Sequence, residues 1–354
     1  MIILKKFLID ACEKARFQLA RVQLFVLFLI LLLSISGCGG RGDTKTSIED
    51  IRVGTEGIVM SFLPNSPPDT IHVDADNTFD VLLEVRNLGA FPQPDELIKT
   101  AALGHDSGRV YISGIDPYIV HFIERHKPID FRKLQGRSTI NPNGGEDVLT
   151  FKGIVDTLNL NVERYEPILL VTACYRYLTV AEPPVCIDPQ PYSTFKERKV
   201  CEAQDISLSS QGAPIAITKI EEEALAQKTL FKITIKNVGR GDVIKLESYE
   251  KCSPYSDVSG KLEREDIDKV LLEGVAVGSK ILQCSPFIDD NIKGESGYIR
   301  LLNGEGSIVC ELSKNDYAPG SSAYTTPLQI VLTYVYRDFI EKRLQIIKET
   351  RGIS

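Results

Sequence analysis

The feature that most constrains this chain is a long uncharged segment near its N-terminus. Residues 22–40 are nineteen positions without Asp, Glu, Lys or Arg, and Leu24–Leu33 is continuously apolar. An α-helix needs about 17–25 such residues to cross the hydrocarbon core of a bilayer. A helix in a soluble core would carry polar positions along one face. The segment therefore predicts a membrane helix or signal segment that ends at residue 40.

The charges on either side of this segment indicate its orientation. Residues 1–21 hold five Lys or Arg against two acidic residues, whereas residues 41–52 hold three of each. Positive flanks stay in the cytoplasm. Residues 1–21 are therefore predicted to be a cytoplasmic leader, amphipathic because its apolar residues recur at three- and four-residue steps. Residues 41–52 would be a tether, and the bulk of the chain would be extracellular.

The end of the apolar segment offers a second mode of attachment. Ile35-Ser36-Gly37-Cys38 resembles the lipobox of exported lipoproteins, in which a cysteine after small residues takes a lipid through its thiol. This pattern predicts lipid attachment at Cys38, with the signal segment removed. An uncut signal anchor is the alternative, because the leader is longer than the charged region of an ordinary signal peptide.

The part of the chain beyond the anchor is long enough for two ordinary domains, which we place at residues 53–200 and 205–354. Its composition suits folded cores, with 43% hydrophobic and 25% charged residues over the whole chain. The net charge of −7 and the absence of any basic stripe argue against a nucleic-acid partner. The absence of Trp disfavours sugar stacking without excluding it.

Eight cysteines occur in the chain, of which Cys12 and Cys38 lie in the leader and the anchor. The other six are Cys174, Cys186, Cys201, Cys252, Cys284 and Cys310. An even number in an exported chain predicts disulfides. Strand and turn signals favour Cys174–Cys186 and Cys284–Cys310, which leaves Cys201–Cys252 by elimination. A zinc site is disfavoured because no two of these cysteines are two to four residues apart and no histidine is near them.

A strand pattern occurs twice in the chain. Residues 79–89 and 230–239 alternate apolar and polar residues and end in Asn-x-Gly. Residues 167–176 and 327–337 form a second matched pair, in which Tyr175 aligns with Tyr336. Period-two alternation followed by a turn signal is typical of a strand. Two matches in the same order indicate two copies of one β unit.

The predicted fold class is therefore mostly β, with the N-terminal membrane helix followed by two tandem immunoglobulin-like β-sandwich domains. Each copy opens with a further strand, at residues 57–63 and 214–220. Helical spacing occurs only at residues 94–103 and 263–271, which we interpret as short helical insertions between strands.

At these motifs the chain resembles a known family. Val85-Arg-Asn-Leu-Gly89 and Ile235-Lys-Asn-Val-Gly239 look like CARDB-type, immunoglobulin-like adhesion-related domains of bacteria and archaea. With Cys186-Ile-Asp-Pro189 and Gly212-Ala-Pro-Ile215, the chain is similar to membrane-anchored archaeal proteins. The first copy departs from the pattern through inserted segments around residues 94–145. The resemblance implies extracellular binding or spacing and supplies no catalytic residue.

A catalytic or metal-binding constellation is not apparent in the sequence. The histidines are His72, His105, His121 and His126. His121 and His126 are five residues apart, whereas a zincin helix places its two histidines four apart. The acidic runs at residues 74–77 and 289–291 could offer oxygen ligands to calcium, but both lack the distal glutamate of a calcium loop, so solvated turns are favoured. We expect no catalytic, cofactor-binding or metal-binding residue.

The function expected from these features is that of a membrane-anchored extracellular interaction or structural protein at the cell surface. Its expected partners are the membrane and a protein or cell-surface polymer. One alternative is an envelope-associated hydrolase that uses residues of the first domain's insertions, since a nucleophilic triad is defined by geometry and cannot be read from spacing. Another is a subunit of a surface or secretion assembly.

Overall fold

The computed structural model describes residues 51–73, 77–92, 108–156, 162–193, 199–255, 260–288, 294–317 and 322–348. The described residues belong to one compact unit that starts at Thr46. The leader, the anchor with Cys38, and the helix expected at residues 94–103 lie outside them. Within the described residues, no helix is long and apolar enough to cross a membrane. We call residues 51–193 the first half and residues 199–348 the second half.

The described chain is built from strands, as the sequence predicts. A nine-stranded sheet runs through both halves in the order β16-β15-β20-β9-β4-β6, with β10 and β14 also pairing β20 and β18 pairing β15. Its strands are β4 (Gly108–Ser113), β6 (His126–Pro128), β9 (Ile168–Ala181), β10 (Pro184–Ile187), β14 (Asp242–Ile244), β15 (Lys269–Val277), β16 (Lys280–Ile281), β18 (Gly297–Arg300) and β20 (Tyr324–Arg343).

Each half adds a smaller sheet of its own. In the first half the order is β1-β3-β7-β5, and in the second it is β11-β12-β13-β19-β17. The strands of the first sheet are β1 (Ile58–Phe62), β3 (Thr78–Asn87), β5 (Val120–Phe122) and β7 (Glu146–Val155). Those of the second are β11 (Ile206–Ser207), β12 (Ile215–Ala224), β13 (Lys228–Asn237), β17 (Gln283–Ser285) and β19 (Glu305–Ser313).

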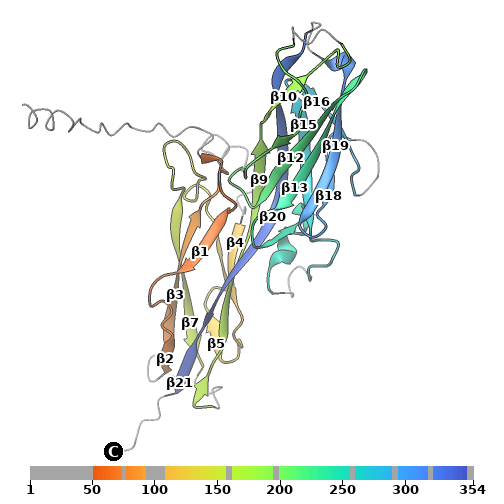
Figure 1. The fold of residues 1–354 in the computed structure, drawn as a ribbon. Coiled ribbons are helices and arrows are strands. Elements are labelled where there is room, and N and C mark those ends of the chain that lie inside the picture. Colours follow the sequence, from red (N-terminus) through yellow and green to blue (C-terminus); the bar gives the residue numbers. More distant parts are fainter. Residues whose placement is uncertain are drawn as a thin grey trace, which may run out of the picture. The chain divides into compact units, whose positions relative to one another are not determined.

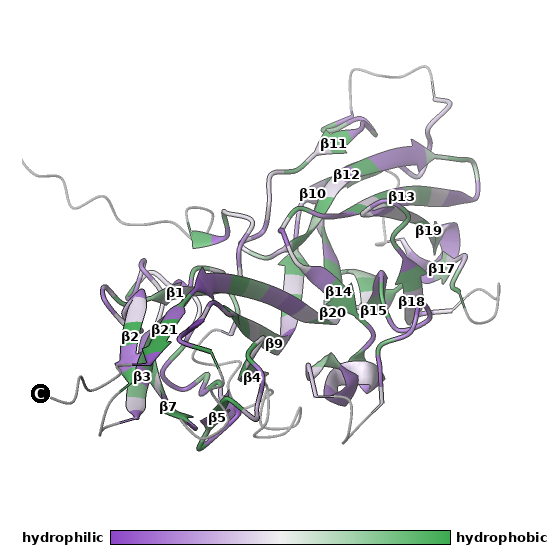
Figure 2. Cartoon of the chain, turned by 90° about the horizontal axis from the view of Figure 1, so that it is seen from below, coloured by the Kyte–Doolittle hydropathy of each residue, from purple (hydrophilic) through white to green (hydrophobic). Residues whose placement is uncertain are grey.

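The two smaller sheets bury one face against the nine-stranded sheet, an arrangement consistent with a β-sandwich in each half. In β3 the alternate residues Phe79, Val81, Leu83 and Val85 are buried, and they belong to one apolar cluster with residues of β9 and β20. Figure 2 shows apolar and polar residues alternating along these strands. The predicted strands that end at Asn87 and Asn237 are confirmed, as are those that open each copy.

The longest strand, β20, joins the two halves. It pairs antiparallel with β9 over fourteen residue pairs, from Ile330–Ala181 to Arg343–Ile168. Beyond it, β21 (Gln345–Lys348) pairs parallel with β2 (Thr70–Val73) and antiparallel with β8 (Arg164–Tyr165), both in the first half. Figure 1 shows β20 running from the second half down to β21 beside β2. The boundary between residues 200 and 205 stays a prediction, since both sides contribute strands to one sheet.

The helix expected at residues 263–271 is wrong. Residues 263–266 form a turn and β15 begins at Lys269. Leu271 pairs with Tyr298 of β18 on one side and with Thr333 of β20 on the other. Pairing with two neighbouring strands outweighs the three- and four-residue apolar spacing, which is short enough to fit either structure. The helical elements named within the described residues are the 3-10 turns η2 (Leu246–Cys252) and η3 (Lys314–Asp316).

Candidate functional site

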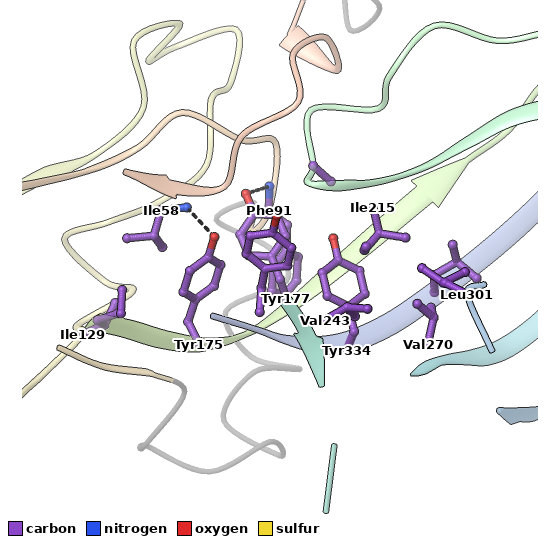
Figure 3. Packing of buried hydrophobic residues seen from close by; sticks show 14 of the residues in the cluster. Ile58, Phe91, Ile129, Tyr175, Tyr177, Ile215, Val243, Val270, Leu301 and Tyr334 are labelled. Carbon is purple, nitrogen blue, oxygen red and sulfur yellow. Dashed lines mark hydrogen bonds between the residues drawn. The ribbon is translucent and has the colours of Figure 1, made fainter. Parts of the chain in front are cut away.

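Four tyrosines lie where β9 of the first half pairs with β20 of the second. Tyr175 and Tyr177 alternate along β9 and pair with Tyr336 and Tyr334 of β20. Their rings lie 5.6–6.4 Å apart between centroids. All four are buried, and we call them the tyrosine cluster. Figure 3 shows Tyr175, Tyr177 and Tyr334 side by side among aliphatic residues.

The repeated Asn-x-Gly motif hydrogen-bonds to one tyrosine of this cluster in each half. In the first half, the Tyr177 hydroxyl donates to Asn87 Oδ1 at 3.0 Å and accepts from the Phe91 N–H at 3.4 Å. The Asn87 amide donates to the Phe91 carbonyl at 2.7 Å. The Gly89 N–H also donates to Asn87 Oδ1, at 3.1 Å. Asn87 therefore holds both the turn after β3 and the tyrosine.

The second half repeats these contacts with Tyr336. Its hydroxyl donates to Asn237 Oδ1 at 3.3 Å and accepts from the Gly241 N–H at 2.7 Å. The Asn237 amide donates to the Gly241 carbonyl at 2.9 Å. A Cβ at Gly239 would collide with the Tyr336 hydroxyl, and one at Gly89 would collide with that of Tyr177. Close approach of the tyrosine explains why glycine follows the turn in both copies.

These contacts correct one detail of the sequence alignment. The sequence matched Tyr175 with Tyr336, but the residue that bonds Asn87 as Tyr336 bonds Asn237 is Tyr177. Tyr175 then corresponds to Tyr334. Because Arg176 pairs with Val335 midway between these residues, an approximate twofold axis relates the two halves at that pair.

A pocket of about 220 Å³ opens over the cluster, between the two halves, and we call it the central pocket. It is lined by residues at the start of β1, in the turn after β13, and on the strands β9 and β20. The lining residues are Thr55, Glu56, Gly57, Ile58, Val59, Tyr175, Pro214, Val238, Gly239, Arg240, Tyr336 and Asp338. Ligand sites occur preferentially at such junctions between domains.

Tyr175 differs from the other three tyrosines in its hydrogen bonding. Its hydroxyl accepts from the Ile58 N–H at 3.2 Å (Figure 3) and makes no further hydrogen bond with the residues that the structure describes. The hydroxyl proton is therefore unused, although the side chain is only 1% exposed. Burial raises the pKa of Tyr175 well above its usual value, and the neighbouring tyrosines add to the rise. The hydroxyl is thus a fixed neutral donor in the wall of the central pocket.

The charged residues that line the central pocket are Glu56, Arg240 and Asp338. Arg240 forms an ion pair with Glu56 at 4.0 Å, and their side chains are 77% and 45% exposed. Asp338 accepts from the N–H of the residue that follows it, at 2.8 Å. Two carboxylates against one guanidinium leave the lining with one net negative charge, and the other lining residues are uncharged.

The structure pairs all six cysteines beyond residue 40. Cys284 lies opposite Cys310 on neighbouring strands and bonds to it, so that predicted pair is confirmed. The predicted Cys174–Cys186 and Cys201–Cys252 pairs are wrong, because Cys174 bonds to Cys252 and Cys186 to Cys201.

The reason for the error is that β9 and β10 do not form a hairpin. Both strands pair with β20, one after the other along its length. The β20 partners of Cys174 and Cys186 are Arg337 and Thr325. These partners are twelve positions apart, which is about 40 Å of strand. Cys174 instead faces η2, where it lies with Tyr249 and Cys252 in a small second core.

The described histidines lie on separate strands: His72 on β2, His121 on β5 and His126 on β6. His105 and the acidic residues 74–76 and 289–291 lie outside the described residues. His121 lines a pocket of about 140 Å³ with Ser113, whose buried hydroxyl has no hydrogen-bond partner in the described part of the chain. The residues that line this pocket include no carboxylate to orient the histidine. Across the described ranges, no group of three or more His, Cys, Asp or Glu residues could hold a metal ion.

Comparisons with known proteins give little support to any one family. No family model and no curated protein matches the chain. Among solved structures, the secreted serine protease VesC from Vibrio cholerae matches 78% of this chain, at 9% identity and a TM-score of 0.16. The match spans half of the VesC chain. The partial N-terminal region of an enterococcal surface protein matches 78% of this chain and 82% of that one, at 10% identity and a TM-score of 0.17. At these TM-scores neither likeness carries a functional argument.

Proposed function

We propose that the chain is a membrane-anchored extracellular protein that presents two joined β modules at the cell surface, as an interaction or structural element without a catalytic step. The observation that carries the proposal is the pairing of all six cysteines beyond residue 40 into three disulfides. Such bonds persist in oxidising compartments outside the cytoplasm. The uncharged segment at residues 22–40 supplies the attachment. The CARDB-type resemblance of the two Asn-x-Gly strands points to the same role.

The fold supports a spacer or a binding platform in particular. The second half contacts the first through β20 and again through β21, which pairs with both β2 and β8. Two modules joined by one short linker would move independently. Here a shared sheet fixes the two modules to one another, so the chain can present them as one rigid platform.

The test is to locate and map the protein in intact cells. We expect an externally added protease to cleave it, and peptide mapping without reduction to return the pairs Cys174–Cys252, Cys186–Cys201 and Cys284–Cys310. Mass analysis of the mature N-terminus would show a lipid on Cys38 or an uncut anchor. Cys38→Ser abolishes lipid attachment in the first case, and Cys12→Ser is the matched control. Recovery of the protein from the cytosol with these six thiols free would refute the proposal.

A further inference from the structure

We propose that the central pocket is a binding site for one neutral sugar residue, such as a unit of a surface polysaccharide. The first reason is the Tyr175 hydroxyl. It is a buried donor whose proton has no acceptor among the described residues, and it lines the pocket. A buried donor without a partner is unfavourable, so the pocket should hold a molecule that offers an acceptor oxygen at this depth.

The second reason is the size and character of the pocket. Its volume of about 220 Å³ is below the range of about 300–1,000 Å³ that holds drug-sized ligands, which limits the occupant to about one ring. The walls combine aliphatic groups of Ile58, Pro214 and Val238 with polar groups of Thr55 and Asp338. A sugar ring presents C–H groups to such aliphatic walls and hydroxyls to the polar ones.

The third reason is the charge pattern. The carboxylates of Glu56 and Asp338, which line the pocket, repel an anionic ligand and accept hydrogen bonds from hydroxyls. The deep end offers the Tyr175 O–H, which is a donor, so it suits an ether or hydroxyl oxygen and not an ammonium group. A neutral polyhydroxylated ring satisfies both ends. It needs no aromatic stacking, which accords with the absence of Trp from the chain.

The choice of a surface sugar rests on the proposed function, because polysaccharide is a ligand available outside the cell. The binding test itself uses purified protein. Failure of the export prediction would therefore leave a positive binding result standing, and failure of binding would leave the disulfide and anchor results standing.

The experiment titrates the purified full-length chain with neutral methyl glycosides of glucose, galactose and mannose, followed by ligand-observed NMR. The protein is kept in a detergent without a sugar headgroup. We expect at least one glycoside to bind saturably in the millimolar range and more tightly than the corresponding uronic acid. Tyr175→Phe removes only the unused donor and the bond to Ile58, and should weaken binding about fivefold, the effect of one hydrogen bond.

Tyr334→Phe is the matched control. It removes a hydroxyl of the same cluster that contacts Thr179 within the protein at 3.0 Å and does not line the pocket, so affinity should change less than twofold. In case Tyr175→Phe fails to fold, Thr55→Trp places an indole at an exposed position of the mouth and should abolish binding. The proposal is overturned if no neutral glycoside saturates, if the uronic acid binds more tightly, or if Thr55→Trp binds as the unmodified chain does.

Discussion

The buried carboxyl of Glu222 leads to a specific prediction of how the stability of the fold depends on pH. It lies on β12 and is 8% exposed. Its Oε2 accepts from the N–H of Cys186 at 3.2 Å, while its Oε1 is buried without a hydrogen-bond partner among the residues described. Burial raises the pKa of Glu222 from 4.5 to about 7, and the bond from Cys186 opposes this rise.

The sign and size of the effect follow from this shift in pKa. Below pH 4.5 the carboxyl is protonated in both the folded and the unfolded chain. Between pH 4.5 and 7 the unfolded chain releases the proton while the folded chain keeps it, so the free energy of unfolding falls as the pH rises. The difference between a pKa of 4.5 and one of about 7 corresponds to at most about 3 kcal/mol of unfolding free energy. Solvent near the carboxyl reduces this to about 1–3 kcal/mol.

The substitution Glu222→Gln removes the titrating group and keeps its shape. Urea unfolding with the disulfides intact, followed by tyrosine fluorescence between pH 4.5 and 7.5, should show the variant equal to the unmodified chain at the acid end. At the neutral end the variant should be more stable by about 1–3 kcal/mol. Glu223→Gln, at the exposed neighbouring position, is the control and should leave the pH dependence unchanged. A Glu222→Gln variant with the original pH slope, or one destabilised at pH 7.5, would refute the reasoning.

Three further predictions concern the packing of the fold. Asn87→Ala should lower the free energy of unfolding by about 2–4 kcal/mol, because Asn87 is fully buried and hydrogen-bonds four groups. The control Asn141→Ala, in an exposed turn, should change it by less than about 1 kcal/mol. Urea unfolding measures both, and equal effects would contradict the role of Asn87. Gly89→Ala should destabilise by more than about 2 kcal/mol through its collision with Tyr177, whereas Gly274→Ala meets nothing closer than 3.9 Å and should be tolerated, which thermal unfolding would show. Replacing Cys174 and Cys252 by Ser should lower the free energy of unfolding by about 4.5 kcal/mol, because this disulfide closes a loop of 78 residues. Replacing Cys186 and Cys201, whose loop spans 15 residues, should lower it by about 3 kcal/mol. The reverse order in urea unfolding would contradict this loop-entropy explanation.

The sequence predicts the strands of this fold more reliably than the contacts between them. Strict alternation in residues 79–87 and 230–237 identifies β3 and β13, because one face of each is buried. The role of the Asn-x-Gly motif could not be inferred, since the tyrosine that packs on each glycine is about ninety residues away. The same limit produced the wrong cysteine pairs, because nothing local shows that β9 and β10 both pair with β20.

The candidate site was missed for a related reason. The sequence matches Tyr175 with Tyr336 as strand residues, but their hydrophobic neighbours along the chain give no sign of a pocket. Alternating aromatic residues at positions 175 and 177, and again at 334 and 336, were the available signal. Aromatic residues at alternate positions of two strands that match one another suggest a shared contact when the strands are neighbours. That adjacency became visible only in the sheet.

The pairing of β9 with β20 also limits where the chain can be truncated. A fragment that ends before residue 200 would keep β9 but lose β20, and would expose the hydrogen-bonding groups of fourteen paired positions along one edge. Open edges of this length recruit strands from other molecules. Recombinant truncation at the interdomain connection should therefore yield aggregates or intertwined dimers.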